Sequence, residues 1–218
     1  MNVLAAIESY AAELEAIGGE APPAPRWTQD WFPRLDAAAA YAVVRATRPR
    51  RIVEVGCGHS TRFLARAVAD GRLDTTITSI DPAPRATLQG LAVRWLRVPV
   101  QAADLAPFQA LEAGDILFVD SSHQLKPGSD VEHLFRQVMP RLKSGVRLHF
   151  HDVFLPDDYP PAWAWRRYNE QEAVRGLLER GHAQEFSSHQ VKGALTGVLA
   201  RLPLVEGAIE SSLWLRKG

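Results

Sequence analysis

The sequence predicts an α/β protein built on a doubly wound, Rossmann-like β-sheet that is mostly parallel and has helices on both faces. Short β-rich runs alternate with stretches of helical periodicity along the 218 residues, as expected for parallel strands joined by helical crossovers. The first strand leads directly into a glycine turn, and four strands end in polar or acidic clusters. Ligands of such sheets bind beyond the carboxyl ends of the strands, so these clusters indicate one crevice.

The expected elements follow from hydrophobic periodicity and from their start and stop signals. Helices are expected over 3–17, 37–47 with Asp36 as its cap, 60–68, 130–142 and 170–180. Strands are expected over 52–55, 75–80, 96–100, 116–119 and 146–150, then weakly from Phe186 and finally over 212–216. We divide the chain into an N-terminal helix and aromatic cover segment, residues 1–35, and a main domain, residues 36–218.

Composition limits the classes of partner. Lys plus Arg and Asp plus Glu number 25 each, so no strong field favours nucleic acid, and a small or neutral substrate is expected. The single cysteine, Cys57, permits no internal disulfide and suits a reducing compartment. No apolar run reaches the length of about 18 residues that a membrane helix needs, and residues 1–19 carry three glutamates instead of a basic leader. We therefore expect a cytoplasmic protein without a membrane partner.

The turn after the first strand reads Arg51-Ile-Val-Glu-Val-Gly-Cys-Gly-His-Ser-Thr61. Its two glycines allow positive φ and let a ligand lie against the backbone. A dinucleotide fingerprint would need a small residue at Thr61, and a phosphate-binding loop would need a lysine, so neither pattern matches. Glu54 would repel a pyrophosphate and favour a cationic ligand. A glycine turn that serves only packing is the alternative.

Two further aspartates lie where a nucleoside would be bound. Asp81 ends the second strand, at the position of the acidic residue that accepts ribose hydroxyls, although it also precedes Pro82 as a turn aspartate would. Asp104 follows the third strand and is expected either to accept from an adenine amino group or to cap a helix.

The ends of the fourth and fifth strands carry the candidate chemistry. Asp120 and Asp152 should lie close together there, with His123 and His151 beside them. Two such carboxylates share a proton, pair with a basic group or bind a hard cation such as Mg²⁺. His123 has the intrinsic pKa of a general base, and a structural hydrogen bond is its alternative role. His149 is expected to be a core histidine.

Aromatic side chains gather in two segments outside the expected strands. Trp27, Trp31 and Phe32 are expected either to pack onto the sheet edge or to cover the substrate. A mobile aromatic cover would combine Trp27 and Trp31 with Tyr159, Trp163 and Trp165.

Several motifs together resemble the class I S-adenosylmethionine (SAM)-dependent methyltransferases, within them the subfamily with an Asp-Ser-Ser-His fourth strand. The motifs are Glu54-x-Gly56-x-Gly58, Gly114-Asp-Ile-Leu-Phe-Val-Asp-Ser-Ser-His123, Pro140-Arg-Leu-Lys-Ser-Gly145, His149-Phe-His-Asp-Val-Phe-Leu-Pro156, Tyr159-Pro160, Asn169-Glu-Gln171 and Ser212-Leu-Trp-Leu-Arg-Lys217. Ser60 departs from the pattern, since many members have a third glycine there.

The resemblance implies a seven-stranded sheet with an antiparallel last strand. It also implies SAM contacts at Glu54, Gly56, Gly58 and Asp81, to which we add Ser60 and Asp104. Related small-molecule and sugar O-methyltransferases hold a divalent metal at the positions of Asp120 and Asp152, and some have a histidine at that of His123.

The sequence is therefore interpreted as a SAM-dependent methyltransferase that methylates an oxygen of a small hydroxylated metabolite or sugar, with Mg²⁺ as an open possibility. Its catalytic residues would be His123 and Asp120. The alternatives are an NAD-linked oxidoreductase and a non-catalytic SAM-binding module. A homo-oligomeric state is left open.

Overall fold

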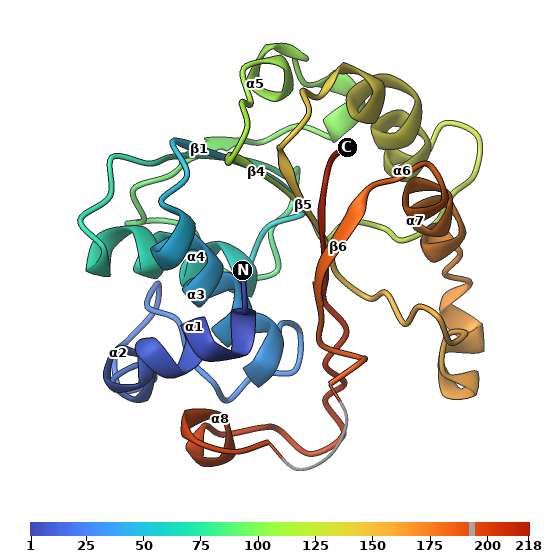
Figure 1. Cartoon of the computed structure of the whole chain (residues 1–218). Helices are drawn as coiled ribbons and strands as arrows, with labels where there is room; N and C mark the ends of the chain where they lie inside the picture. The colour runs from blue at the N-terminus through green and yellow to red at the C-terminus, as the bar shows by residue number, and fades with distance from the viewer. Residues whose placement is uncertain (192–194) are drawn as a thin grey trace.

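The computed structural model describes residues 1–191 and 195–218 and contains a seven-stranded sheet in the order β3-β2-β1-β4-β5-β7-β6 (Figure 1). The strands are β1 (Arg51–Val55), β2 (Thr76–Ile80), β3 (Arg94–Leu96), β4 (Ile116–Val119), β5 (Arg147–Phe150), β6 (Ala183–Ser187) and β7 (Leu213–Arg216). Strands β1 to β5 pair in parallel, and β7 is antiparallel to both β5 and β6. The predicted fold class, including the antiparallel last strand, is confirmed.

The strand order reverses between β1 and β4, which are hydrogen-bonded neighbours although β2 and β3 lie between them in the chain. Crevices form at such points because the connections leave the two strands in opposite directions. The carboxyl ends of β1 and β4 therefore face a natural binding site.

The helices are α1 (Val3–Ser9), α2 (Ala11–Glu15), α3 (Arg34–Thr47), α4 (His59–Asp70), α5 (Ala106–Gln109), α6 (Asp130–His133), α7 (Glu170–Glu179) and α8 (Val198–Arg201). Short 3₁₀ segments cover Val100–Ala102, Met139–Arg141 and Pro161–Arg166, and a π-helical segment covers Leu134–Val138. Among the described residues, no helix combines the length and the apolar character that a membrane span requires.

Alternate residues of each central strand point to opposite faces of the sheet and pack into two separate hydrophobic cores. On β4, Ile116 and Phe118 pack into the core beneath α1, α3 and α4, whereas Leu117 and Val119 pack into the core beneath α7 and the π-helical segment. Both faces of the central strand are buried, which explains its continuous apolar sequence.

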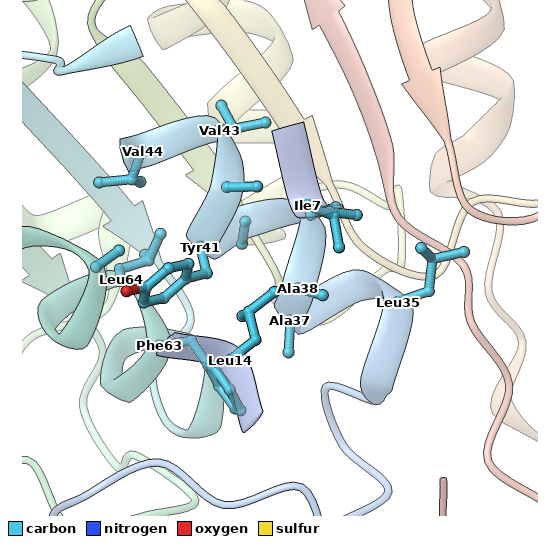
Figure 2. Close-up of a cluster of buried hydrophobic side chains, with 14 of the residues drawn as sticks. Ile7, Leu14, Leu35, Ala37, Ala38, Tyr41, Val43, Val44, Phe63 and Leu64 are labelled. Carbon is cyan, nitrogen blue, oxygen red and sulfur yellow. The ribbon is translucent and has the colours of Figure 1, made fainter. Parts of the chain in front are cut away.

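Small residues of α3 let neighbouring helices approach closely. Figure 2 shows Ala37, Ala38 and Tyr41 of α3 among side chains of α1, α2 and α4, including Leu14 and Phe63. The helices of the predicted N-terminal segment thus pack into the same core as the predicted main domain.

Four expected elements differ from the structure, one of them the strand expected from Phe186, which spans Ala183–Ser187. The helix over 3–17 is interrupted at Tyr10, and the helix over 130–142 changes to π and 3₁₀ geometry before Pro140, which lacks the N–H that a regular helix needs. The third strand ends at Leu96 instead of residue 100, because Pro99 cannot donate to a ladder and Val100 begins a 3₁₀ turn.

The expectation that Asp36 caps α3 is wrong, because the helix begins at Arg34 with Pro33 at the N-cap. Asp36 is fully buried inside the first turn and faces the end of the sheet. Its carboxylate accepts from the backbone N–H groups of Ser211 and Ser212, at 3.0 and 2.9 Å.

Candidate active site

A cavity of about 630 Å³ opens at the carboxyl ends of β1, β2, β4 and β5. It is lined by the glycine turn and Asp81 on one side and by Asp120, His123 and Asp152 on the other. The sequence-predicted residues of both groups therefore meet at one site, at the point where the strand order reverses.

Gly56 brings the ends of β1 and β4 together. Its φ is 80°, and a Cβ at this position would lie 1.7 Å from the carbonyl oxygen of Asp120. No larger residue fits between the two strand ends. The glycine thus sets the position of Asp120 relative to the turn.

Glu54 lies beneath the turn and is not among the residues that line the cavity. It is fully buried and accepts from the hydroxyls of Ser60, Thr61 and Ser79 at 2.7, 2.7 and 2.9 Å. Thr61 in turn accepts from the N–H of Gly58, at 2.9 Å. Instead of facing a ligand as expected, the Glu54 carboxylate holds the turn and the start of α4 in place.

The pKa of Glu54 reflects this position. Burial raises it, and the hydroxyl donors oppose the rise, which leaves the pKa at about 7.

Asp81 lines the cavity and ties the glycine turn to the end of β2. Its carboxylate accepts from the N–H groups of Cys57 and Ala83, at 2.8 and 2.7 Å. A carboxylate offers about four acceptor positions, so two remain for a ligand. The bond from Ala83, two residues on, is that of the turn aspartate that the sequence offered as the alternative.

Asp104 lies apart from the cavity, contrary to its assignment as a cofactor contact. Its carboxylate accepts from the N–H of Ala106 at 2.8 Å, at the first turn of α5. Asp104 is not the N-cap either, because Leu105 takes that position, so the contact closes a turn just before the helix. Pro99, Val100 and Gln101 line the cavity on this side. Pro99 and Val100 were expected to belong to the third strand, but Val100 begins a 3₁₀ segment.

His123 lies between carboxylates on both sides of its ring. Nδ1 is 2.9 Å from Glu170, and Nε2 is 3.3 Å from Asp120 and 3.5 Å from Asp152. The backbone of His123 has a positive φ of 57°, and its carbonyl accepts from the N–H of Glu170 at the start of α7. Such strained backbone is common at functional sites and persists only where the surroundings fix it.

His151 forms a second link between the same aspartates. Its Nδ1 lies 3.4 Å from Asp120 and 3.5 Å from Asp152, while Nε2 contacts Asp36 at 3.2 Å. Ser211 donates to Asp152 at 3.1 Å. The cluster therefore joins α3, β4, β5 and the segment before β7.

The charges of the cluster stabilise one another. Burial alone would lower the pKa of His123 and of His151, but the surrounding carboxylates raise both well above the usual range. Burial would raise the pKa of Asp120, but the two histidines hold it well below its ordinary value. At neutral pH the site therefore consists of imidazolium and carboxylate groups, the basic-group pairing that the sequence left open.

His149 is a core histidine, as expected, but its buried Nδ1 has no hydrogen-bond partner among the described residues. It is fully buried, stacks on Phe118 with ring centroids 3.6 Å apart, and contacts the Ser212 hydroxyl at 2.8 Å. Burial lowers its pKa well below the usual value, so it stays neutral.

Of the expected aromatic cover, Trp31 and Trp163 line the cavity. Trp31 is 47% exposed, whereas Trp27 is buried in the core, which is its packing alternative. Phe32 is buried as well, but it also lines the cavity, with its ring centroid 5.4 Å from that of His151. Trp165 is 76% exposed and lies outside the lining.

Sequence reasoning missed three contributors to the site. Glu170 was assigned only to a helix, Asp36 to a helix cap, and Tyr168, whose ring lies 4.7 Å from that of His123, to no element. Each lies far from Asp120 in sequence, and only the motif Asn169-Glu-Gln171 gave a signal at one of them.

The comparisons with known proteins agree with this geometry. Residues 53–153 match a family model described as a methyltransferase domain. The match runs from β1 past the end of β5 and includes Asp81, Asp120 and Asp152. This segment of the chain is thus similar to a methyltransferase domain, which confirms the resemblance to methyltransferases. No curated protein matches the chain.

Solved structures share the fold at low sequence identity. The methyltransferase PaMTH1 of Podospora anserina, solved with S-adenosylhomocysteine (SAH) bound, has a TM-score of 0.55 and 17% identity, over 100% of this chain and 88% of that one. A putative caffeoyl-CoA O-methyltransferase from Staphylococcus aureus has a TM-score of 0.53 and 15% identity, over 97% and 92% of the two chains. These similarities establish the fold.

Proposed function

We propose that the protein is a SAM-dependent methyltransferase that methylates an oxygen of a small hydroxylated metabolite or sugar. The observation that carries the proposal is the placement of Asp81 and of the His123 cluster on one cavity. The methyltransferase match and the SAH-bound structural neighbour support the choice of cofactor.

The residues present fit SAM. Asp81 retains acceptor positions for ribose hydroxyls, and the backbone of Gly56 and Gly58 lines the same side of the cavity. Ser60 also lines it, and its hydroxyl donates to Glu54. When bound, SAM supplies an electrophilic methyl group on a sulfonium, and transfer of that group to an acceptor hydroxyl leaves SAH and a proton.

The protein's part is to orient the acceptor oxygen and receive its proton. Glu170 holds Nδ1 of His123, so Nε2 is the nitrogen that faces the cavity beside Asp120 and Asp152. We assign the proton to this atom in the deprotonated form of His123, whose share grows as the pH rises, with Asp120 as the carboxylate that stabilises the resulting imidazolium. The transfer otherwise depends on proximity and alignment.

Assistance by Mg²⁺ is part of the proposal. Asp120 and Asp152 contact the same two histidine nitrogens, so the two carboxylates lie close together. Mg²⁺ is often held by one or two carboxylates plus water, and these two would fit it. Among the described residues, no group of three or more His, Cys, Asp or Glu has an arrangement suited to a metal ion.

The test is SAH formation from SAM with a panel of small diols, phenols and sugars. His123→Gln should lower kcat by about 100-fold or more, the usual loss of a general base, while SAM affinity stays unchanged. His182→Gln, which alters a histidine outside the cavity, is the matched control. Equal turnover of the His123 variant and the wild type would contradict the assignment.

A further inference from the structure

Three cations line the cavity without a carboxylate partner among the described residues, and one of them, Arg85, lies over the Trp31 ring at 4.0 Å. Lys126 and Arg166 both line the cavity that contains His123. The ammonium of Lys126 donates to the amide oxygen of Gln124 at 3.0 Å, and the amide nitrogen of Gln124 donates to the carbonyl of Arg166 at 3.0 Å. One glutamine thus connects the ammonium of Lys126 to the backbone of Arg166.

None of the carboxylates that line the cavity, Asp30 among them, forms an ion pair with Lys126 or Arg166 in the described part of the chain. Asp120 and Asp152 contact histidines, Asp81 accepts from backbone N–H groups, and Asp130 accepts from the N–H and hydroxyl of Ser122. The positive charge of Lys126 and Arg166 is therefore available to a ligand.

Arg166 is held in a fixed position by aromatic rings. Its guanidinium carbon lies 4.3 Å from the centre of the Trp163 ring and 5.1 Å from that of Trp165, and one terminal nitrogen donates to the Tyr168 hydroxyl at 3.1 Å. Its Nε is buried without a hydrogen-bond partner. Its other terminal nitrogen has no hydrogen-bond partner among the described residues, and a guanidinium is a preferred donor to a carboxylate or phosphate.

Tyr168 relates this group to the proposed site of chemistry. One side of the tyrosine lies against the His123 ring, with centroids 4.7 Å apart, and its hydroxyl contacts Arg166. The distance between an anion bound at Arg166 and an acceptor hydroxyl bound at His123 would thus be about the width of one aromatic ring. Trp163, packed edge-on to Tyr168 at 6.1 Å, adds an apolar wall between the two points.

We propose that the methyl acceptor carries an anionic group, a carboxylate or a phosphate, which Arg166 and Lys126 bind while its hydroxyl lies at His123. This inference rests on the proposed function and specifies its substrate class. The anion fixes one end of the acceptor and the reacting oxygen the other, so the pair of cations selects hydroxy acids or phosphorylated alcohols over neutral alcohols.

The alternative explanation is that Arg166 has a purely structural role and only packs against Trp163, Trp165 and Tyr168. Arg97 provides the matched control, because it also lies over an indole ring, that of Trp95 at 5.4 Å, but outside the cavity.

The experiment is calorimetric titration with phenol, benzoate and phenyl phosphate, with and without saturating SAH. Wild-type protein should bind at least one of the two anions, and phenol more weakly. Arg166→Gln should weaken anion binding about tenfold or more, as expected for lost charge-assisted hydrogen bonds. Lys126→Gln should weaken it several-fold, and Arg97→Gln should leave it unchanged.

The inference would be overturned if the wild type bound neither anion. It would also be overturned if both cavity variants bound the anion as tightly as the wild type. Lys126→Gln keeps the test decisive if the Arg166 variant unfolds. SAH binding without anion binding would refute the substrate class alone, whereas failure to bind SAH and SAM would count against the proposed function. The titrations without SAH test the cation pair in either case.

Discussion

Replacing Glu54 by glutamine should change how the stability of the protein depends on pH. Glu54 is fully buried, and its pKa is raised from 4.5 to about 7. The folded state therefore prefers the protonated acid. Glutamine is neutral at every pH, so the substitution removes the titration but keeps the size of the side chain.

The magnitude follows from the shift. One pKa unit corresponds to about 1.4 kcal/mol, so the rise from 4.5 to about 7 corresponds to roughly 3 kcal/mol. Because the pKa is raised on folding, this stability is fully present below pH 4.5 and is lost as the pH rises through 7. Relative to Glu54→Gln, the wild type should lose roughly 3 kcal/mol of unfolding free energy between pH 4 and pH 8.

The assay is urea unfolding followed by tryptophan fluorescence at several pH values. The amide cannot accept from all three hydroxyls, so the variant also carries a constant penalty, and the evidence lies in the slope of the difference with pH. Glu206→Gln, at an exposed carboxylate, is the control. The reasoning would be refuted if the difference in unfolding free energy between the wild type and Glu54→Gln did not vary with pH. It would also be refuted if the wild type became relatively more stable as the pH rises.

Three further predictions concern the charged cluster. Because carboxylates raise the pKa of His123, the rate of methyl transfer should still increase with pH above pH 7. Glu170→Gln should shift this rise in rate to lower pH. A rate that does not vary with pH would contradict the role of His123 as base. Mg²⁺ should release protons from the wild type in weakly buffered solution, because it would displace imidazolium protons from Asp120 and Asp152. Asp152→Asn should abolish the release, and no release from the wild type would count against the metal. Asp36→Asn should lower the unfolding free energy by about 2 to 4 kcal/mol, because the amide cannot accept from both Ser211 and Ser212 as the carboxylate does. Asp158→Asn, at the surface, should leave that free energy within about 0.5 kcal/mol of the wild type.

The central strands could be predicted because their signals are local. Ile116–Val119 is a short apolar run between a turn and an acidic end, and the structure gives a strand with the same bounds. The glycine turn likewise ends β1 where expected, at Val55. Such elements depend on neighbouring residues, so the sequence alone determines them.

The partners of the site residues depend on long-range contacts that no local pattern encodes. Glu54 was expected to face a ligand, but three hydroxyls from α4 and β2 surround it. Asp36 lies 115 residues from His151 in sequence and yet contacts it. Periodicity predicts the face of an element, whereas these contacts depend on how separate elements pack together.

Calorimetric titration with SAM tests the central claim most directly, on the wild type and on Asp81→Ala and Asp104→Ala. Asp81 lines the cavity and Asp104 does not, so the two variants remove the same group inside and outside the site. SAM should bind the wild type, about tenfold or more weakly in Asp81→Ala and unchanged in Asp104→Ala. No binding of SAM to the wild type, or binding of NAD in its place, would contradict the account.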